Sequence, residues 1–382
     1  MNDFGTNLDH EKIFLKVFDL MNNYKQSPLG QILSYEFFVH CFETKLRMEH
    51  ELSDPIMKQC LQESIKRPIF VSGMPRTGTT YLHRLLSLDP AARAPLAFEL
   101  FEPVQRKKDD PVRDKQDRIN IFQRQMDIVH MIVPRFAAIH EANAILPEEC
   151  LCALSQDVPL FFPTFPQIIK PEAGVFDWNT GQAYKNHVKT LQLLQYQESK
   201  AQAEQGSGSP SQKRWVLKCP IHTTFLPYLY DAFPEATVVF THRKAEEALP
   251  SFASLIETSQ CMFHGSRFMQ MDEIGLCCLK FMSKTVRCLD MADTKRSAHV
   301  KYEALTADPI RTVKNLYRSL DLEFTSEYES ILQRFVAKDS EERQKLAGKQ
   351  GGILHSYSRN KFGLCAELIK SEFSWYEQKY VY

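Results

Sequence analysis

The sequence predicts an α/β fold in which a mainly parallel central sheet is flanked by helices. An apolar run at 69–71 enters a glycine-bounded turn and continues as a segment with leucines at helical spacing. Two later apolar runs, 215–218 and 236–241, are each followed by another helical segment. Strands that alternate with helices in this way run parallel to one another. The 382 residues, 43% of them hydrophobic, are sufficient for a substantial core.

The N-terminal part of the chain is expected to be a helical extension that ends at about residue 66. Apolar side chains recur at helical spacing from residue 8 onward, and the first strand follows at 69–71. The helix after the glycine-bounded turn is expected to reach about residue 88. These patterns indicate that the first strand of the sheet and its turn directly follow the helical extension in the chain.

Residues 104–210 are expected to form a largely helical insertion between the first two long strands. The charged segment 104–135 and the segment 182–203 have helical character, whereas 147–178 is apolar and rich in proline. The Gly/Ser tract 205–212 predicts a surface loop.

The remaining elements continue the strand–helix alternation. The runs 215–218 and 236–241 predict two strands, a fourth strand is expected around 299–302, and a helix is expected at 310–320. Because the predicted strands extend from residue 69 to residue 302, one domain over 1–382 is favoured over two.

Composition excludes several classes of function. The 47 basic and 47 acidic residues cancel, so no global field would attract nucleic acid or an acidic membrane, and any anion site must be local. The polar N-terminus lacks an apolar signal core, and no run approaches the ~18 apolar residues of a membrane span. The ten cysteines form no CxxC pair and no zinc-type cluster, so free thiols, no metal and a cytoplasmic location are expected.

The turn after the first strand is the most informative motif. Its spacing, G-x-x-x-x-G-T-T from Gly73, is close to the phosphate-binding loop G-x-x-x-x-G-K-[ST]. In that arrangement the free N–H groups of the following helix point at the anion, and the helix dipole favours its charge. Thr79 replaces the lysine that reaches the terminal phosphates of a nucleoside triphosphate. The motif therefore predicts a phosphate site with less charge to neutralise, although a turn without a ligand remains an alternative.

A second motif, Trp215-Val-Leu-Lys-Cys-Pro-Ile-His222, places two titratable side chains after a strand. Lys218 and His222 lie on either side of Pro220, at the end of the sheet where open α/β folds bind ligands. A histidine of near-neutral pKa suits proton abstraction from a hydroxyl, and a nearby lysine stabilises developing negative charge. A helix-capping histidine beside a solvated lysine is the alternative interpretation.

A third motif follows the next predicted strand. Arg243 leaves the strand, and Ser251 follows eight positions later. Arginine offers bidentate hydrogen bonds to a phosphate, and the serine hydroxyl adds another donor. Alone, this motif would also fit an ordinary strand–turn–helix with a surface arginine.

Together, in this order, the three motifs resemble the sulfotransferases that use 3′-phosphoadenosine-5′-phosphosulfate (PAPS). The segment Pro75-Arg-Thr-Gly-Thr-Thr80 resembles their 5′-phosphosulfate loop, and the Arg243–Ser251 interval resembles their 3′-phosphate site. The tail His355-Ser-Tyr-Ser-Arg-Asn-Lys-Phe-Gly-Leu364 resembles that of bacterial-type members. The resemblance implies a P-loop-like fold and a donor-binding set composed of Pro75, Arg76, Thr77, Gly78, Thr79, Thr80, Arg243 and Ser251.

The resemblance also implies a metal-independent, in-line transfer in which His222 removes the acceptor proton while Lys218 and Arg76 stabilise the transition state. The histidine follows the lysine by four positions, whereas the interval in the cytosolic enzymes is two, so the base remains open. Other candidates are His140 and the pair Glu148–Glu149 in a Pro-Glu-Glu element that resembles one in bacterial-type members. That element also reads as a plain helix start.

The apolar composition of the insertion favours a small apolar alcohol or sterol-like acceptor, and hence a role in lipid or steroid metabolism. Phe161, Phe162, Phe165 and Trp178 are candidates for the acceptor pocket, with ordinary core packing as the alternative. Two other functions remain open: an ATP-dependent small-molecule kinase and a non-catalytic nucleotide-binding regulatory protein. A homodimer is also left open.

Overall fold

The structure is a computed structural model, and it describes residues 8–22, 26–136, 142–160, 168–204, 213–264, 270–349 and 359–382. Several residues with a predicted role lie outside these ranges: His140, Phe161, Phe162, Phe165, the tract 205–212 and the tail residues 355–358.

A five-stranded sheet in the order β2-β3-β1-β4-β5 forms the centre of the fold, and every pair of neighbours is parallel. The predicted parallel sheet is therefore confirmed. The strand order brings the carboxyl ends of β3, β1 and β4 side by side, which is where the three sequence motifs begin. The strands are β1 (Ile69–Gly73), β2 (Ala92–Arg93), β3 (Arg214–Lys218), β4 (Thr237–His242) and β5 (Ser297–Lys301).

The central strands β3, β1 and β4 are buried on both faces, and alternate residues of β1 point to different layers. Ile69 and Val71 pack with α3 (Thr79–Ser87) and α14 (Pro309–Ser319), whereas Phe70 belongs to the larger core on the opposite face. Burial on both faces explains why β1 reads as a continuous apolar run.

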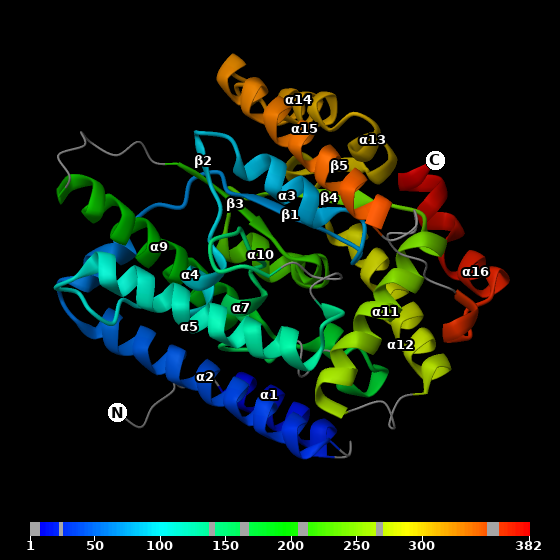
Figure 1. The fold of residues 1–382 in the computed structure, drawn as a ribbon, viewed down its shortest axis with the longest axis horizontal. Helices are drawn as coiled ribbons and strands as arrows, with labels where there is room; N and C mark the ends of the chain where they lie inside the picture. Colours follow the sequence, from blue (N-terminus) through cyan, green and yellow to red (C-terminus); the bar gives the residue numbers. More distant parts are fainter. Residues whose placement is uncertain are drawn as a thin grey trace.

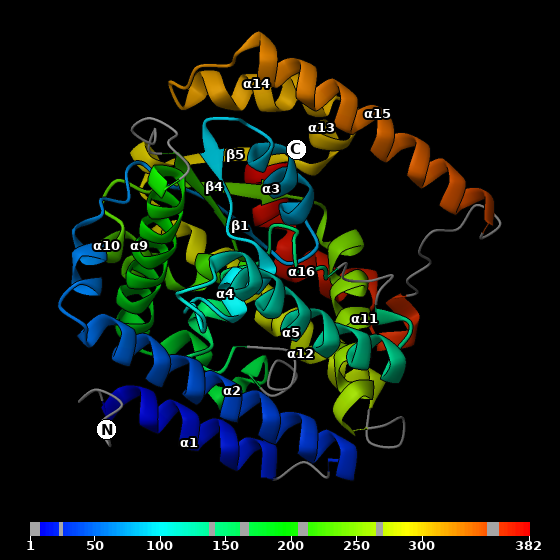
Figure 2. The same ribbon diagram turned by 60° about the vertical axis from the view of Figure 1, so that its left-hand side comes forward.

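The helices form a layer on each face of the sheet (Figures 1 and 2). α3, α14 and α15 cover one face, and the larger core on the other face draws on α9, α10, α11 and α12. The other α-helices of the described residues have these ranges: α1 (Leu8–Asn22), α2 (Pro28–Ser53), α4 (Ala97–Phe101), α5 (Pro111–Ile132), α7 (Leu151–Leu154), α9 (Gly181–Glu204), α10 (Leu226–Ala232), α11 (Ala245–His264), α12 (Met271–Arg287), α13 (Tyr302–Ala307), α15 (Ser326–Lys349) and α16 (Ala366–Tyr376).

In the described part of the N-terminal segment the structure has α1, α2 and the short 3-10 helix η1 (Met57–Gln62). Phe14 and Phe42 bring α1 against α2, with ring centroids 5.0 Å apart. At the start of α2, the backbone N–H of Ser27 donates to the carbonyl of Phe263 in α11. One core includes side chains from α1, the sheet and the C-terminal helix α16, and we propose that the chain forms one domain.

Two elements differ from the sequence prediction. Strand β2 is only two residues long and has no apolar run, so only its pairing with Arg214 and Trp215 defines it. Helix α5 begins at Pro111 rather than near 104, because the side chain of Asp110 accepts a hydrogen bond from Arg113 N and caps it. Within the described ranges, no helix has the length and apolarity that a bilayer span requires.

Candidate active site at the carboxyl ends of the strands

The loop after β1 is held in place by two glycines with left-handed backbone conformations. Gly73 has φ +130°, and a Cβ there would lie 2.6 Å from the carbonyl oxygen of Thr241 in β4. Gly78 has φ +91°, and a Cβ there would lie 2.8 Å from the ring of Tyr302. Any larger side chain would clash at either position, so the spacing of the two glycines determines the shape of the loop.

Within this loop, the side chain of Thr77 faces the sheet. It is fully buried and donates to the carbonyl of Met74 at 2.7 Å, and its oxygen lies 2.6 Å from the hydroxyl of Thr241. Thr77 was predicted to contact the donor, but its side chain stabilises the loop from behind. Only its backbone could face a ligand.

The structure brings together the three side chains expected to hold the donor's anionic groups. Arg76 in the loop donates from Nε to the hydroxyl of Ser251 at 3.0 Å. Arg243 donates from Nη1 to the backbone carbonyl of Arg76 at 3.2 Å. Segments 167 and 175 residues apart in sequence therefore meet at one end of the site.

Tyr302 also lines this end of the cavity, where it contacts Arg243, and the sequence analysis did not identify it. The guanidinium of Arg243 lies 4.1 Å from the centroid of the Tyr302 ring, and Arg243 Nε donates to Glu247 at 3.0 Å. Tyr302 begins α13 immediately after β5, so its position depends on the strand order. The signal that could have indicated it is its position at the end of the strand expected around 299–302, at the edge of the sheet where the other motifs begin.

At the end of β3, a buried ion pair replaces the expected lysine–histidine pair. Lys218 Nζ lies 2.5 Å from Glu149 Oε1 and donates to the hydroxyl of Thr80 at 3.3 Å. Lys218 is 1% exposed, and Glu149 retains 19% of its side-chain exposure. Burial acts to lower the pKa of Lys218, but the carboxylates of Glu149 and Glu148 outweigh it and raise that pKa. The lysine is therefore charged and directed at the start of α3.

Two backbone contacts hold the Pro-Glu-Glu element (Pro147–Glu149) beside the end of β3. Cys150 N donates to the carbonyl of Lys218 at 2.9 Å, and Pro147 forms an antiparallel bridge with Leu96. Glu148 is buried, and its carboxylate accepts from the backbone N–H of Glu149 at 2.7 Å. Of the two acidic residues, only Glu149 lines the cavity.

His222 does not lie in the cavity. It is fully buried in the short 3-10 helix η4 (Pro220–Phe225), where its Nδ1 lies 2.7 Å from the hydroxyl of Tyr184. Its ring packs at an interplanar angle of 88° to that of Phe70, and its Nε2 has no hydrogen-bond partner among the described residues. Burial, and then nearby His187, lowers its pKa well below the usual value. The geometry therefore does not support the predicted role of His222 as the base that meets the acceptor.

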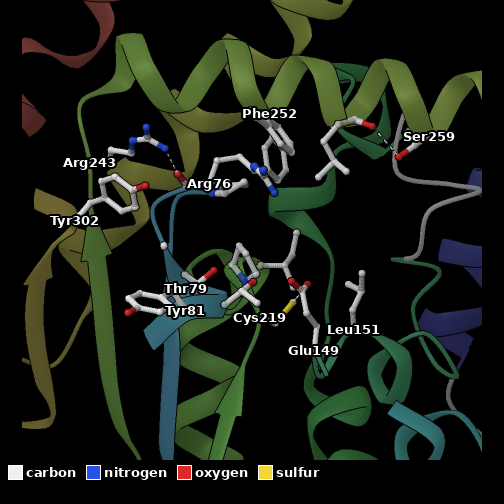
Figure 3. A pocket seen from close by; sticks show the side chains of 17 residues that line it. Arg76, Thr79, Tyr81, Glu149, Leu151, Cys219, Arg243, Phe252, Ser259 and Tyr302 are labelled. Atoms are coloured by element: carbon white, nitrogen blue, oxygen red, sulfur yellow. Dashed lines mark hydrogen bonds between the residues drawn. The ribbon is translucent and has the colours of Figure 1, made fainter. Parts of the chain in front are cut away.

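An open cavity with a volume of about 260 Å³ lies between these groups (Figure 3). Arg243, Arg76 and Tyr302 lie on one side of it, and Glu149 points into it beside Cys219. Away from these charges, Ser259 lines the cavity together with five apolar side chains: Leu151, Ile221, Phe252, Leu255 and Phe281. The site thus combines a cationic end with an apolar end, and a carboxylate lies between them.

The acceptor-pocket candidate Trp178 lies elsewhere, and Cys219 lies at the cavity without being activated. Trp178 packs in the large core and donates from its indole N–H to Ala173 O at 3.0 Å, so it does not line the cavity. Cys219 lines the cavity, but burial and then the charge of Glu149 raise the pKa of its thiol well above the usual value. A neutral thiol is a poor nucleophile, so covalent catalysis has no support here.

Comparisons with known proteins bear on the family and the fold. A model of the sulfotransferase family matches residues 68–326. The fold is similar to the crystal structure of sulfotransferase STF9 from Mycobacterium avium, with a TM-score of 0.78 and 20% identity over 98% of this chain and 92% of that one. Sulfotransferase STF1 from Mycobacterium tuberculosis H37Rv gives a TM-score of 0.73 and 24% identity over 98% and 94%. No curated protein sequence matches the chain.

Proposed function

Because the chain belongs to the sulfotransferase family, we propose that it transfers a sulfuryl group from PAPS to a hydroxyl of a small, mostly apolar acceptor. The observation that carries the proposal is the cavity itself. The arginines Arg76 and Arg243, which form a cationic corner, face the same space as the Glu149 carboxylate and the apolar end of the cavity. The Glu149 carboxylate is paired with Lys218.

The residues at the cationic corner fit the two anionic groups of such a donor. The loop of Arg76 and the N-terminus of α3 at Thr79 would take the 5′-phosphosulfate, with Thr80 and Lys218 beside it. Arg243 and Ser251 would take the 3′-phosphate. Pro75 and Gly78 line the cavity and shape the loop.

We propose Glu149 as the general base. Its Oε1 is paired with Lys218, and its Oε2 lies 3.8 Å from Cys219 Sγ at the junction of the cationic and apolar ends. As the acceptor oxygen forms its bond to sulfur, its proton passes to the Glu149 carboxylate. The bond from sulfur to the phosphate-bridging oxygen breaks, and Arg76 and Lys218 stabilise the charge that develops there. The products are the sulfate ester and adenosine 3′,5′-bisphosphate.

The apolar end favours a neutral acceptor with an apolar body. Leu151, Ile221, Leu255 and Phe281 offer it no cationic partner. An acceptor with a carboxylate or phosphate at that end would lose its hydration without compensation.

The direct test is transfer of labelled sulfate from PAPS to a panel of neutral alcohols, including sterols and shorter alkyl alcohols, with matched carboxylated analogues. We expect a labelled ester with neutral acceptors, in buffer with or without a chelator. Transfer only to anionic acceptors would contradict the assignment of the apolar end, and phosphate transfer from ATP would contradict the proposal as a whole.

Replacing Arg243 by alanine is expected to weaken the affinity for adenosine 3′,5′-bisphosphate by roughly 30- to 100-fold, since a charge-assisted contact to phosphate is lost. Titration calorimetry measures this change. Lys244→Ala is the matched control, because Lys244 is the adjacent cation and pairs with Glu303 instead. Equal affinity in wild type and Arg243→Ala would reject the role of Arg243.

Leu255→Ala is expected to raise KM for an apolar acceptor by roughly 10-fold and to leave KM for PAPS unchanged, because it removes apolar contact at one end only. Steady-state kinetics with each substrate varied in turn measures both constants. Leu276→Ala, at an exposed position on α12, is the control. An unchanged acceptor KM would show that the acceptor binds elsewhere.

A further inference from the structure

The C-terminal turn of the chain packs against the start of α11, behind the cationic corner. Helix α16 ends at Tyr376 and continues as the π-helical turn η8 (Glu377–Val381). In Figure 1 the C-terminus lies near α13 and β5, and α16 lies beside α11 and α12. Neither Tyr376 nor Glu377 lines the cavity.

Glu377 caps the helix that follows Arg243. Its Oε1 accepts a hydrogen bond from the backbone N–H of Ala245 at 2.7 Å, and Ala245 is the first residue of α11. The four N–H groups at a helix start lack intrahelical partners, and a carboxylate there also meets the positive end of the helix dipole. The cap is only two residues beyond Arg243, so it restricts the backbone from which the guanidinium extends.

Tyr376 contacts the same segment from a second direction. Its hydroxyl lies 3.2 Å from Nδ1 of His242, the residue directly before Arg243. His242 Nε2 in turn lies 2.8 Å from Nδ1 of His299 in β5. Burial lowers the pKa of His242 to about 3, and His299 and Lys301 contribute to this effect, so the ring is neutral and its Nδ1 can accept from the tyrosine.

Tyr380 completes the packing around these histidines. Its ring stacks on His242 with centroids 4.8 Å apart and an interplanar angle of 8°, and it also stacks on His299 at 5.2 Å. Outside this cluster, Lys244 pairs with Glu303 and Lys301 donates to the carbonyl of Tyr382. The residues on both sides of Arg243 therefore contact the last seven residues of the chain: His242 through its ring and Ala245 through its backbone N–H.

We propose that Glu377 and Tyr376 are positioning residues that hold Arg243 in the orientation required for the donor's 3′-phosphate. The inference rests on the proposed function and assigns a task to the C-terminal turn, which does not line the cavity. It predicts that substitutions in this turn weaken the affinity for nucleotides that carry a 3′-phosphate. The affinity for a nucleotide with only a 5′-phosphate is expected to stay unchanged.

The test is titration calorimetry of Glu377→Ala and Tyr376→Phe with two nucleotides, adenosine 3′,5′-bisphosphate and adenosine 5′-monophosphate. Each variant is expected to bind the bisphosphate about 10-fold more weakly, in line with the loss of a helix cap or an equivalent hydrogen bond, and to bind the monophosphate as wild type does. Glu377→Gln keeps an oxygen that can accept from Ala245 N–H and is expected to restore most of the affinity. Glu367→Ala, an exposed acidic position on α16, is the control.

The outcomes separate the inference from the function on which it rests. If wild type prefers the bisphosphate and both variants keep that preference, the positioning role is rejected and the proposed function stands. Equal weakening towards both nucleotides would mean that the turn only stabilises the fold, which also rejects the role. If wild type itself does not distinguish the two nucleotides, the proposed function fails and the inference fails with it.

Discussion

Glu149→Gln is expected to lower turnover by about 10²- to 10⁴-fold, because the amide cannot take the acceptor proton. The amide oxygen can still accept a hydrogen bond from Lys218, so the variant keeps a partner for that buried ammonium. The affinity for adenosine 3′,5′-bisphosphate is expected to change little. Single-turnover transfer from PAPS, measured with bound donor, isolates the chemical step.

Two matched variants make the assignment of the base specific. Glu148→Gln changes the adjacent carboxylate, which is buried and outside the cavity, and is expected to keep turnover within a few-fold of wild type. His222→Gln changes the fully buried imidazole and is expected to act through stability, with little effect on the chemical step of the folded protein. Near-normal turnover in Glu149→Gln together with loss in a folded His222→Gln would assign the base to His222 instead.

Stability is expected to fall by about 5.5 kcal/mol between pH 7.5 and pH 5.5, because four buried histidines are neutral in the folded state. Burial lowers the pKa of His83, His187 and His242 to about 3, and that of His222 well below its usual value. In the unfolded chain each titrates near the ordinary value of about 6.5. Below that pH the unfolded state binds more protons, so the free energy of unfolding decreases as pH falls, by about 1.4 kcal/mol per histidine over this range.

Denaturant unfolding at pH 7.5, 6.5 and 5.5 measures this change in a window where carboxylates contribute little. His187→Leu is the informative variant, since neither nitrogen of His187 has a hydrogen-bond partner among the described residues. It is expected to reduce the pH-dependent loss by about a quarter. A free energy of unfolding that stays constant between pH 7.5 and pH 5.5 would contradict the neutral, buried state of these rings.

The sheet and its loop could be predicted from the sequence because local patterns encode them. The continuous apolar run of β1 reflects burial on both faces, and Gly73 and Gly78 stand where the backbone requires positive φ. Arg243 directly follows β4, and Ser251 lies in the second turn of α11. Both side chains therefore contact Arg76. Strand β2 has no such pattern, since two residues suffice for its pairing.

Which side chains face the centre of the cavity depends on contacts between segments that are distant in sequence. For this reason the sequence left several residues open as the general base. Whether Glu149 or His222 faces the cavity depends on the bond from Cys150 N to the Lys218 carbonyl, which joins segments 68 residues apart. Tyr302 meets Arg243 only because β5 lies next to β4. Leu255 reads as one of many apolar positions on a buried helix, and its exposure to the cavity follows from how α11 lies against the sheet.

The central claim is that the cationic corner binds a 3′-phosphorylated sulfuryl donor, and calorimetry tests it most directly. Wild-type protein would be titrated with adenosine 3′,5′-bisphosphate and, separately, with ATP and Mg²⁺. We expect tight binding of the bisphosphate that does not change when a chelator is added, and weaker binding of ATP under either condition. Preferential, magnesium-dependent binding of ATP would contradict the account and favour a phosphate-transferring enzyme.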